Sequence, residues 1–254
     1  AAVSKPTFID IEDASWMWGI LITDKDRVST TGICNFPSHM GSLNYGYASV
    51  GGWRRISPKL YNQIPESDVR KGWFLDDTGV SVNLPAAAQA YITKKGAPVY
   101  TQVKYGPMND EWGSNNNATD VILMRVEEMY LIKAEAQAMN NDVSGGVNTL
   151  NSFVNTYRDP SYKCTATTGE AVQEAVWHQR RIEFWGEGLA YFDIMRLNKG
   201  VNRLGCGFPK TAVFNIAAGD PVQIYSIPNK EVQYNPLLEN NPLVSAPTPI
   251  PDEE

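Results

Sequence analysis

The feature that most constrains the fold of this 254-residue sequence is a change of character at about residue 121. Beyond this point the chain is rich in Ala, Glu, Leu, Met and Lys, which are strong helix formers, and its apolar side chains recur at steps of three and four. Thr167 and Glu170 have capping-box spacing at the start of the last such segment, and Gly200 ends it. We therefore predict a mainly α fold with antiparallel helices packed like tetratricopeptide repeats. The predicted helices are 122–140, 146–158 and 170–198.

The first part of the chain lacks this regularity. Residues 15–23, "SWMWGILIT", are rich in aromatic and branched side chains and predict a buried strand. Residues 97–105 alternate like a second strand, and a short helix is expected at 57–64. The sequence thus predicts a large irregular, loop-rich lobe with short strands at 1–120. A helical region with an irregular, proline-rich tail is predicted at 121–254.

Composition excludes several classes of function. With 43% apolar and 20% charged residues, the chain has the composition of a soluble globular protein. A net charge of −6, with Lys and Arg dispersed along the chain, argues against a nucleic-acid partner. Three distant cysteines and two histidines without partners at ligand spacing predict no disulfide framework, metal site or cofactor. The first residues carry no signal-peptide pattern, so we expect either a cytoplasmic protein or a piece whose targeting end has been removed.

The stretch "RRIEFWGEG" at 180–188 has two interpretations. Glu183 and Glu187 are four residues apart and would share one face of a helix, at a separation that alone does not exclude a retaining glycosidase pair. However, nearby arginines would keep both carboxyl groups ionised and leave no proton donor. We favour a buried charged network between helices. It is predicted to contain a salt bridge between one of Arg125, Arg180 or Arg181 and one of Glu183, Glu187 or Glu128.

Three segments, in order along the chain, resemble the signatures of the SusD/RagB family. The first is matched by Arg125, Glu128, Leu131, Ala134, Glu135 and Ala136. The second is matched by Arg180, Arg181, Glu183, Glu187, Gly188, Asp193 and Arg196. The third is matched by Ile227, Pro228, Asn235, Pro236, Leu238, Asn241 and Pro242. Asp68 and Arg70 also resemble the Asp-x-Arg element of the family, while Phe184, Glu239 and Leu243 depart from its usual Leu, Gln and Gly.

The resemblance implies a function at the cell surface. Members of the family are about twice as long as this chain, which resembles their C-terminal portion. They are non-catalytic lipoproteins of the outer membrane of Bacteroidetes-type bacteria, anchored by a lipidated N-terminal cysteine that is absent from this chain. The implied ligand is an oligosaccharide or polysaccharide, and the implied partner is a TonB-dependent, SusC-like transporter. A peptide ligand, a helical-repeat adaptor that binds proteins and a glycoside hydrolase remain as alternatives.

The family motifs transfer no ligand residue, so a binding surface is predicted on physical grounds. A sugar ring needs an aromatic face for its C–H side and polar groups for its hydroxyls. Two polar loops, at 30–55 and 109–120, offer both, and loops of this length are often functional. The predicted ligand-binding residues are Trp53, Tyr45, Tyr47, Trp112, Asn115 and Arg54. These aromatic residues could instead merely cover the lobe, and Trp16, Trp18, Trp177 and Trp185 are expected in the core.

Overall fold

Helices make up most of the regular structure in the computed structural model, which describes residues 5–26, 35–242 and 244–250. Strands are few and short, so the predicted mainly α class is confirmed. The chain divides into two compact units, residues 1–187 and 188–254. The predicted change from loop-rich to helical structure near residue 120 lies within the first unit.

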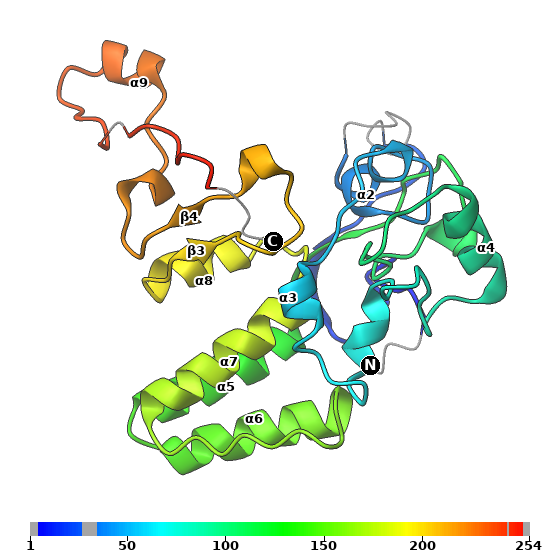
Figure 1. The fold of residues 1–254 in the computed structure, drawn as a ribbon, viewed down its shortest axis with the longest axis horizontal. Coiled ribbons are helices and arrows are strands. Elements are labelled where there is room, and N and C mark those ends of the chain that lie inside the picture. The colour runs from blue at the N-terminus through cyan, green and yellow to red at the C-terminus, as the bar shows by residue number, and fades with distance from the viewer. Residues whose placement is uncertain (1–4, 27–34, 243, 251–254) are drawn as a thin grey trace. The chain divides into compact units, whose positions relative to one another are not determined.

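Three long helices form the helical part of the first unit. They are α5 (Val126–Met139), α6 (Val143–Tyr157) and α7 (Gly169–Glu183), and α5 packs against both of the others (Figure 1). Side chains cap two of the N-termini, because Asp142 accepts from the amide of Gly145 at 2.9 Å and Thr168 from that of Ala171 at 3.2 Å. The antiparallel arrangement agrees with the prediction.

The start of the first predicted helix is wrong by four residues. Residues Val121–Arg125 form strand β2, which pairs antiparallel with strand β1 (Trp16–Ile20). In this register Trp16 lies opposite Arg125 and Ile20 opposite Val121. The branched side chains that were compatible with a helix are equally suited to a strand. Pairing with β1, which lies about 100 residues earlier in the sequence, stabilises the strand here.

The prediction of one helix over 170–198 is also wrong. Helix α7 ends at Glu183, and a separate helix, α8 (Ala190–Arg196), begins after six intervening residues. Gly186 and Gly188 lie between them with φ of 80° and 85°, in the left-handed region that favours glycine and ends a helix. Glu187 is therefore in the turn between the helices and does not share a helix face with Glu183.

The loop-rich part of the first unit contains more helix than expected. It holds α2 (Phe36–Met40), α3 (Pro58–Tyr61) and α4 (Ala86–Lys94), with 3-10 turns at Ala48–Val50, Val69–Trp73 and Met108–Asp110. The helix expected at 57–64 is thus present in shorter form. Residues 97–105 do not form a strand; they make isolated bridges, such as Arg55 with Thr101 and Phe74 with Gln102.

Burial of β1 also differs from the prediction. Trp18 is 62% exposed and Met17 56%, so this strand is not a core strand and Trp18 is not a core residue. The reason is that, within the described ranges, β1 pairs with β2 in a sheet of two strands, which leaves much of its surface uncovered. Trp16, Trp177 and Trp185 are half-buried, whereas Trp73 is 1% exposed and belongs to the core.

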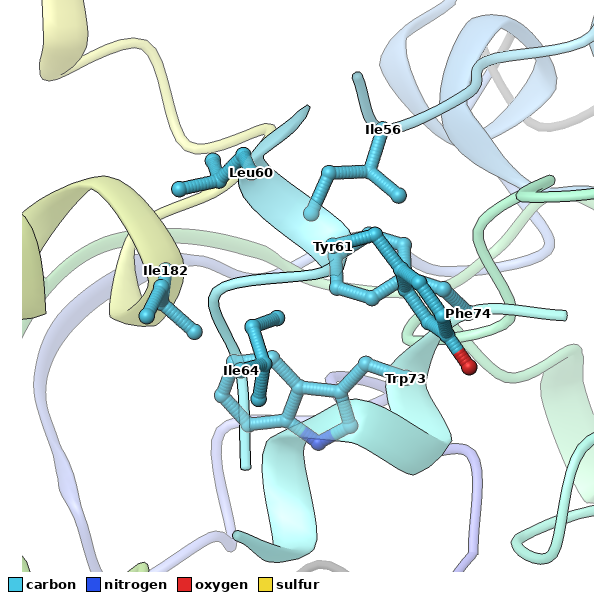
Figure 2. Close-up of a cluster of buried hydrophobic side chains, with 7 residues drawn as sticks. All are labelled: Ile56, Leu60, Tyr61, Ile64, Trp73, Phe74 and Ile182. Carbon is cyan, nitrogen blue, oxygen red and sulfur yellow. The ribbon is translucent and has the colours of Figure 1, made fainter. Parts of the chain in front are cut away.

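Two hydrophobic clusters can be followed among the described residues of the first unit. One joins α3 and the turn at Val69–Trp73 to α7 through Ile182 (Figure 2). Its buried members are Ile56, Leu60, Tyr61, Ile64, Trp73, Phe74 and Ile182. The other lies under α4 and consists of Leu43, Leu75, Ala88, Ile92 and Val103.

The second unit has little regular structure after α8. Strands β3 (Val201–Asn202) and β4 (Asn215–Ile216) pair antiparallel, and the short helix α9 covers Asn229–Tyr234. Two 3-10 turns, Lys210–Ala212 and Pro221–Gln223, connect these elements. Residues 235–242 and 244–250 contain no helix or strand. Throughout the described residues, every helix is too short or too polar to cross a bilayer.

The contact between α5 and α6 predicts an unusual effect at Gly146. A Cβ atom there would lie 2.7 Å from the carbonyl oxygen of Ala134 and 2.9 Å from the Cβ of Ala138. Helix propensity alone would make Gly146→Ala stabilising by about 1 kcal/mol. We expect a loss of roughly 1–3 kcal/mol in the free energy of unfolding, because the two helices must move apart. Urea unfolding measures it, with Asn148→Ala on the exposed face of α6 as the control. A stabilised Gly146→Ala variant would contradict the close approach.

Candidate functional site

Glu183, the last residue of α7, lies at the centre of a buried group of charges. Its side chain is 0% exposed, and both carboxylate oxygens are paired. Oε1 accepts from Arg125 at 2.5 Å and from Arg158 at 2.9 Å. Oε2 accepts from Arg158 at 2.8 Å and from Arg70 at 3.1 Å. Three guanidinium groups therefore surround one carboxylate.

The surrounding charges are paired in turn. Arg125 also binds Glu187 at 2.8 Å, Arg158 binds Glu127 at 3.0 Å, and Arg70 binds Asp68 at 2.6 Å. The cations and anions of this group, which we call the charge cluster, are equal in number, so no net charge is buried. Its members are Asp68, Arg70, Lys104, Arg125, Glu127, Arg158, Glu183 and Glu187.

Lys104 links the loop-rich part to the end of α7. Its ammonium donates to the carbonyl oxygens of Glu183 at 2.9 Å and Trp185 at 3.0 Å, and to the carboxylate of Glu187 at 2.5 Å. It also lies 4.6 Å from the ring centres of Phe8 and Trp73. Burial lowers the pKa of Lys104 to about 8, although Glu187 opposes this. All three ammonium protons are used, so the group is part of the structure.

The charge cluster keeps both glutamates ionised. Burial would raise the pKa of Glu183, but Arg158 and Arg125 hold it well below its usual value. For Glu187, burial is likewise outweighed by Arg125 and Lys104, which lower the pKa. Glycoside hydrolysis needs one protonated carboxyl group as general acid, and this pair supplies none at neutral pH.

The predicted salt bridges are confirmed, since Arg125 binds Glu183 and Glu187, and Arg180 binds Glu128 at 3.3 Å. Arg181 lies over the ring of Trp177, at 5.1 Å from its centre. The network is larger than predicted, because Arg70, Lys104 and Arg158 come from turns or irregular chain with no periodicity to reveal them. The Asp-x-Arg motif was the one available signal for Arg70.

The residues predicted to bind a ligand, which we call the loop surface, come from two loops that pair with each other. The amide of Gly113 donates to the carbonyl oxygen of Leu43 at 2.8 Å, and that of Tyr45 to Ser114 at 2.7 Å. These bonds bring Tyr45 beside the loop that carries Trp112 and Asn115. The loop surface consists of Tyr45, Tyr47, Trp53, Arg54, Trp112 and Asn115.

The two tyrosines are the most exposed aromatic residues of the loop surface. Tyr45 is 49% and Tyr47 43% exposed. The ring of Tyr47 stacks on His39 with centres 4.9 Å apart, and the Arg54 guanidinium lies 5.7 Å from the same ring. Arg54 is fixed there by a bond of 3.0 Å to the carbonyl oxygen of His39. A polar donor therefore lies next to an accessible aromatic ring.

The two tryptophans of the loop surface are held more firmly. Trp53 and Trp112 are half-buried, and both pack against the cluster of Leu43, Leu75 and Val103. Asn115 is exposed, and its carbonyl oxygen accepts from the side chain of Asn117 at 3.3 Å. The arrangement offers two accessible tyrosines on a base of partly buried tryptophans. Across the described ranges, no three His, Cys, Asp or Glu side chains are grouped to hold a metal ion.

Comparison with known proteins points to one family. The model of the SusD family matches residues 65–243. A SusD-like carbohydrate binding protein from Bacteroides vulgatus is 26% identical with a TM-score of 0.56, over 78% of this chain and 37% of that one. A SusD superfamily protein from Bacteroides thetaiotaomicron is 22% identical with a TM-score of 0.67, over 90% and 49%. The chain therefore spans less than half the length of these solved structures. No curated protein matches it.

The charge cluster predicts a large cost for neutralising its centre. Glu183→Gln keeps the shape of the side chain but leaves three guanidinium groups without their shared anion. We expect the free energy of unfolding to fall by roughly 3–5 kcal/mol, as for other buried pairs that lose one partner. The control is Glu66→Gln, because the Glu66 side chain is 88% exposed where it binds Lys71. That change should cost less than about 1 kcal/mol. Equal losses in urea unfolding would contradict a special role for Glu183.

The lowered pKa of Glu183 also predicts a dependence on pH. The unfolded chain takes up a proton near the ordinary value of 4.5, whereas folded Glu183 resists protonation. Its stabilisation is therefore present above pH 4.5 and is lost as the pH falls toward the folded pKa. In this range the free energy of unfolding of the wild type should fall more steeply than that of Glu183→Gln, by about 1.4 kcal/mol per pH unit. This difference is the contribution of one proton. Parallel profiles of unfolding free energy against pH would show that Glu183 is not held ionised.

Proposed function

The chain belongs to the SusD family, and from this we propose that it is a non-catalytic carbohydrate-binding protein of the cell surface. It captures oligosaccharides or polysaccharides and passes them to a TonB-dependent, SusC-like transporter of the outer membrane, to which a lipidated cysteine anchors the whole protein. Support for the ligand class comes from the family match and from the similarity to a SusD-like carbohydrate binding protein.

The state of the glutamate pair supports the non-catalytic part of the proposal. Glu183 is fully buried among arginines. Burial would raise the pKa of both glutamates, but nearby cations outweigh it. Arg158 and Arg125 lower the pKa of Glu183, and Arg125 and Lys104 lower that of Glu187. A hydrolase would need a cleft with one carboxyl group protonated and both within reach of a sugar. The carboxylates instead complete the packing between the loop-rich part and the helices.

We propose that the loop-rich part at 1–120 faces the ligand and that the loop surface binds it. The observation that carries this assignment is the pair of exposed tyrosines, Tyr45 and Tyr47, next to the fixed guanidinium of Arg54. Tyrosine rings stack on the C–H side of a sugar, while the guanidinium and the side chain of Asn115 bond its hydroxyls. Trp53 and Trp112 supply the base of the surface and keep the loops in place.

The loop surface predicts which substitutions weaken binding. A glycan array identifies the preferred oligosaccharide, and calorimetry then gives its affinity for each variant. Tyr47→Ala and Trp53→Ala should each cost roughly 1–3 kcal/mol of binding free energy, by analogy with aromatic residues that stack on nucleobases.

Trp18→Ala is the matched control, because Trp18 is 62% exposed on β1 and lies outside the loop surface. It should bind the glycan as the wild type does. Wild-type affinity in the Tyr47→Ala, Trp53→Ala double variant would remove this loop from the site, and a loss confined to Trp18→Ala would place the site at β1.

A further inference from the structure

A pocket of about 510 Å³ lies in the first unit, between the turn at Val69–Trp73 and the loop that follows it. This volume is within the range of small-molecule sites, about 300–1,000 Å³. None of the residues of the loop surface lines it. Its lining includes Tyr61, Glu66, Lys71, Phe74, Asp76, Asp77 and Tyr100.

Tyr61 places an unused hydroxyl at this pocket. The residue is 7% exposed, and its ring packs in the core while its hydroxyl oxygen points away from Leu60 and Ile182 (Figure 2). Within the described part of the chain, the structure gives this hydroxyl no hydrogen-bond partner. Burial, with the charges of Asp76 and Glu66, raises the pKa of Tyr61 to about 12, so the hydroxyl keeps its proton. Because Tyr61 lines the pocket and its hydroxyl has no protein acceptor there, this proton is available to a bound molecule.

Asp76 and Asp77 supply carboxylate acceptors at the pocket. Oδ1 of Asp76 is occupied by the amides of Thr78 and Val80, at 2.8 and 2.9 Å, and these bonds hold the loop. Burial would raise the pKa of Asp76, but these hydrogen bonds lower it and keep the carboxyl group charged. Asp77 is exposed beside it. The charge of Glu66 is balanced by Lys71 at 2.5 Å, and that of Asp68 by Arg70 at 2.6 Å. The carboxylates of Asp76 and Asp77 therefore give the pocket an excess of negative charge.

An aromatic wall completes the pocket. The rings of Tyr61 and Tyr100 are 5.1 Å apart and tilted by 57°, and Phe74 meets Tyr61 edge to face at 6.5 Å. Tyr100 is fixed by backbone bonds to Leu75 at 3.1 Å and Ile56 at 3.0 Å. The pocket thus combines aromatic rings, a free phenol donor and carboxylate acceptors.

We infer that this pocket binds one non-anionic sugar unit, as a second saccharide site separate from the loop surface. Hydroxyls of the sugar donate to the carboxylates of Asp76 and Asp77, and one sugar oxygen accepts from Tyr61. A uronic acid is repelled by the same carboxylates. The inference rests on the proposed carbohydrate-binding function and adds a site and a charge preference to it.

The test is a titration of the chain with methyl β-D-glucoside, methyl β-D-galactoside, methyl α-D-mannoside and the sodium salt of methyl β-D-glucuronide, followed by NMR. At least one neutral glycoside should bind, at least 10-fold more tightly than the glucuronide. Tyr61→Phe removes only the hydroxyl and should weaken this binding about 3- to 10-fold, the range for one neutral hydrogen bond. Tyr157→Phe, an exposed tyrosine of α6, is the matched control and should bind as the wild type does.

The variants separate this inference from the proposed function. Loss in Tyr61→Phe with unchanged binding in the Tyr47→Ala, Trp53→Ala double variant supports the pocket. The reverse pattern overturns it and leaves the loop surface as the site. Equal binding of the glucuronide, or no binding of any neutral glycoside, also overturns it, and an array on which no glycan binds would overturn the proposed function as well. Asp77→Asn provides a second variant in case Tyr61→Phe does not fold, and it should reduce the preference for neutral sugars.

Discussion

The carboxylate of Glu183, shared by three guanidinium groups, is the interaction on which the rest of the first unit depends. Arg70 comes from the turn after Asp68, Arg125 from the end of β2, and Arg158 from the end of α6. One side chain therefore fixes the mutual positions of a loop-rich segment, a strand and two helices. Burying so many charges is tolerated because each has an opposite partner, and the loss of any one leaves others unpaired.

This arrangement separates structural charge from ligand recognition. The conspicuous carboxylates of the sequence, Glu183 and Glu187, are inside and are held by arginines and by Lys104. The proposed binding groups lie instead on segments whose backbones are fixed by that interior: the paired loops carrying Tyr45 and Asn115, and the turn and loop around Tyr61 and Asp77. Rigid positioning of such groups reduces the entropy lost when a sugar binds.

The helices and part of the charge cluster were predictable from sequence because their signals are local. Periodicity located α5, α6 and α7, and the arginines and glutamates near 125–128 and 180–187 were correctly paired. The break at Gly186 was not predicted, because a helical hydrophobic pattern continues across it and the left-handed glycines show only in the backbone. Arg158 and Lys104 were missed because they lie in a turn and in irregular chain, where no periodicity marks a buried position.

The loop surface illustrates another limit of sequence reasoning. Composition correctly placed aromatic and polar residues in two loops, but it could not show that Gly113 and Leu43 join these loops or that Trp53 packs inward. Exposure of Trp18 was missed for a related reason, since an apolar strand is buried only if something covers it, and in the described residues β1 pairs with β2 alone. The pocket at Tyr61 has no sequence signature, because it depends on how the loop carrying Asp76 folds back.

Amide hydrogen exchange, compared between the wild type and Glu183→Gln under native conditions, tests most directly whether Glu183 joins these parts. Three amides far from α7 in sequence report on the loop-rich part. The amide of Val69 donates to the carbonyl oxygen of Arg158, that of Leu75 to Thr101, and that of Val103 to Trp73. If one carboxylate holds the segments together, protection falls at these amides and in α5 as well as in α7. Loss of protection confined to the last turn of α7 would contradict the account.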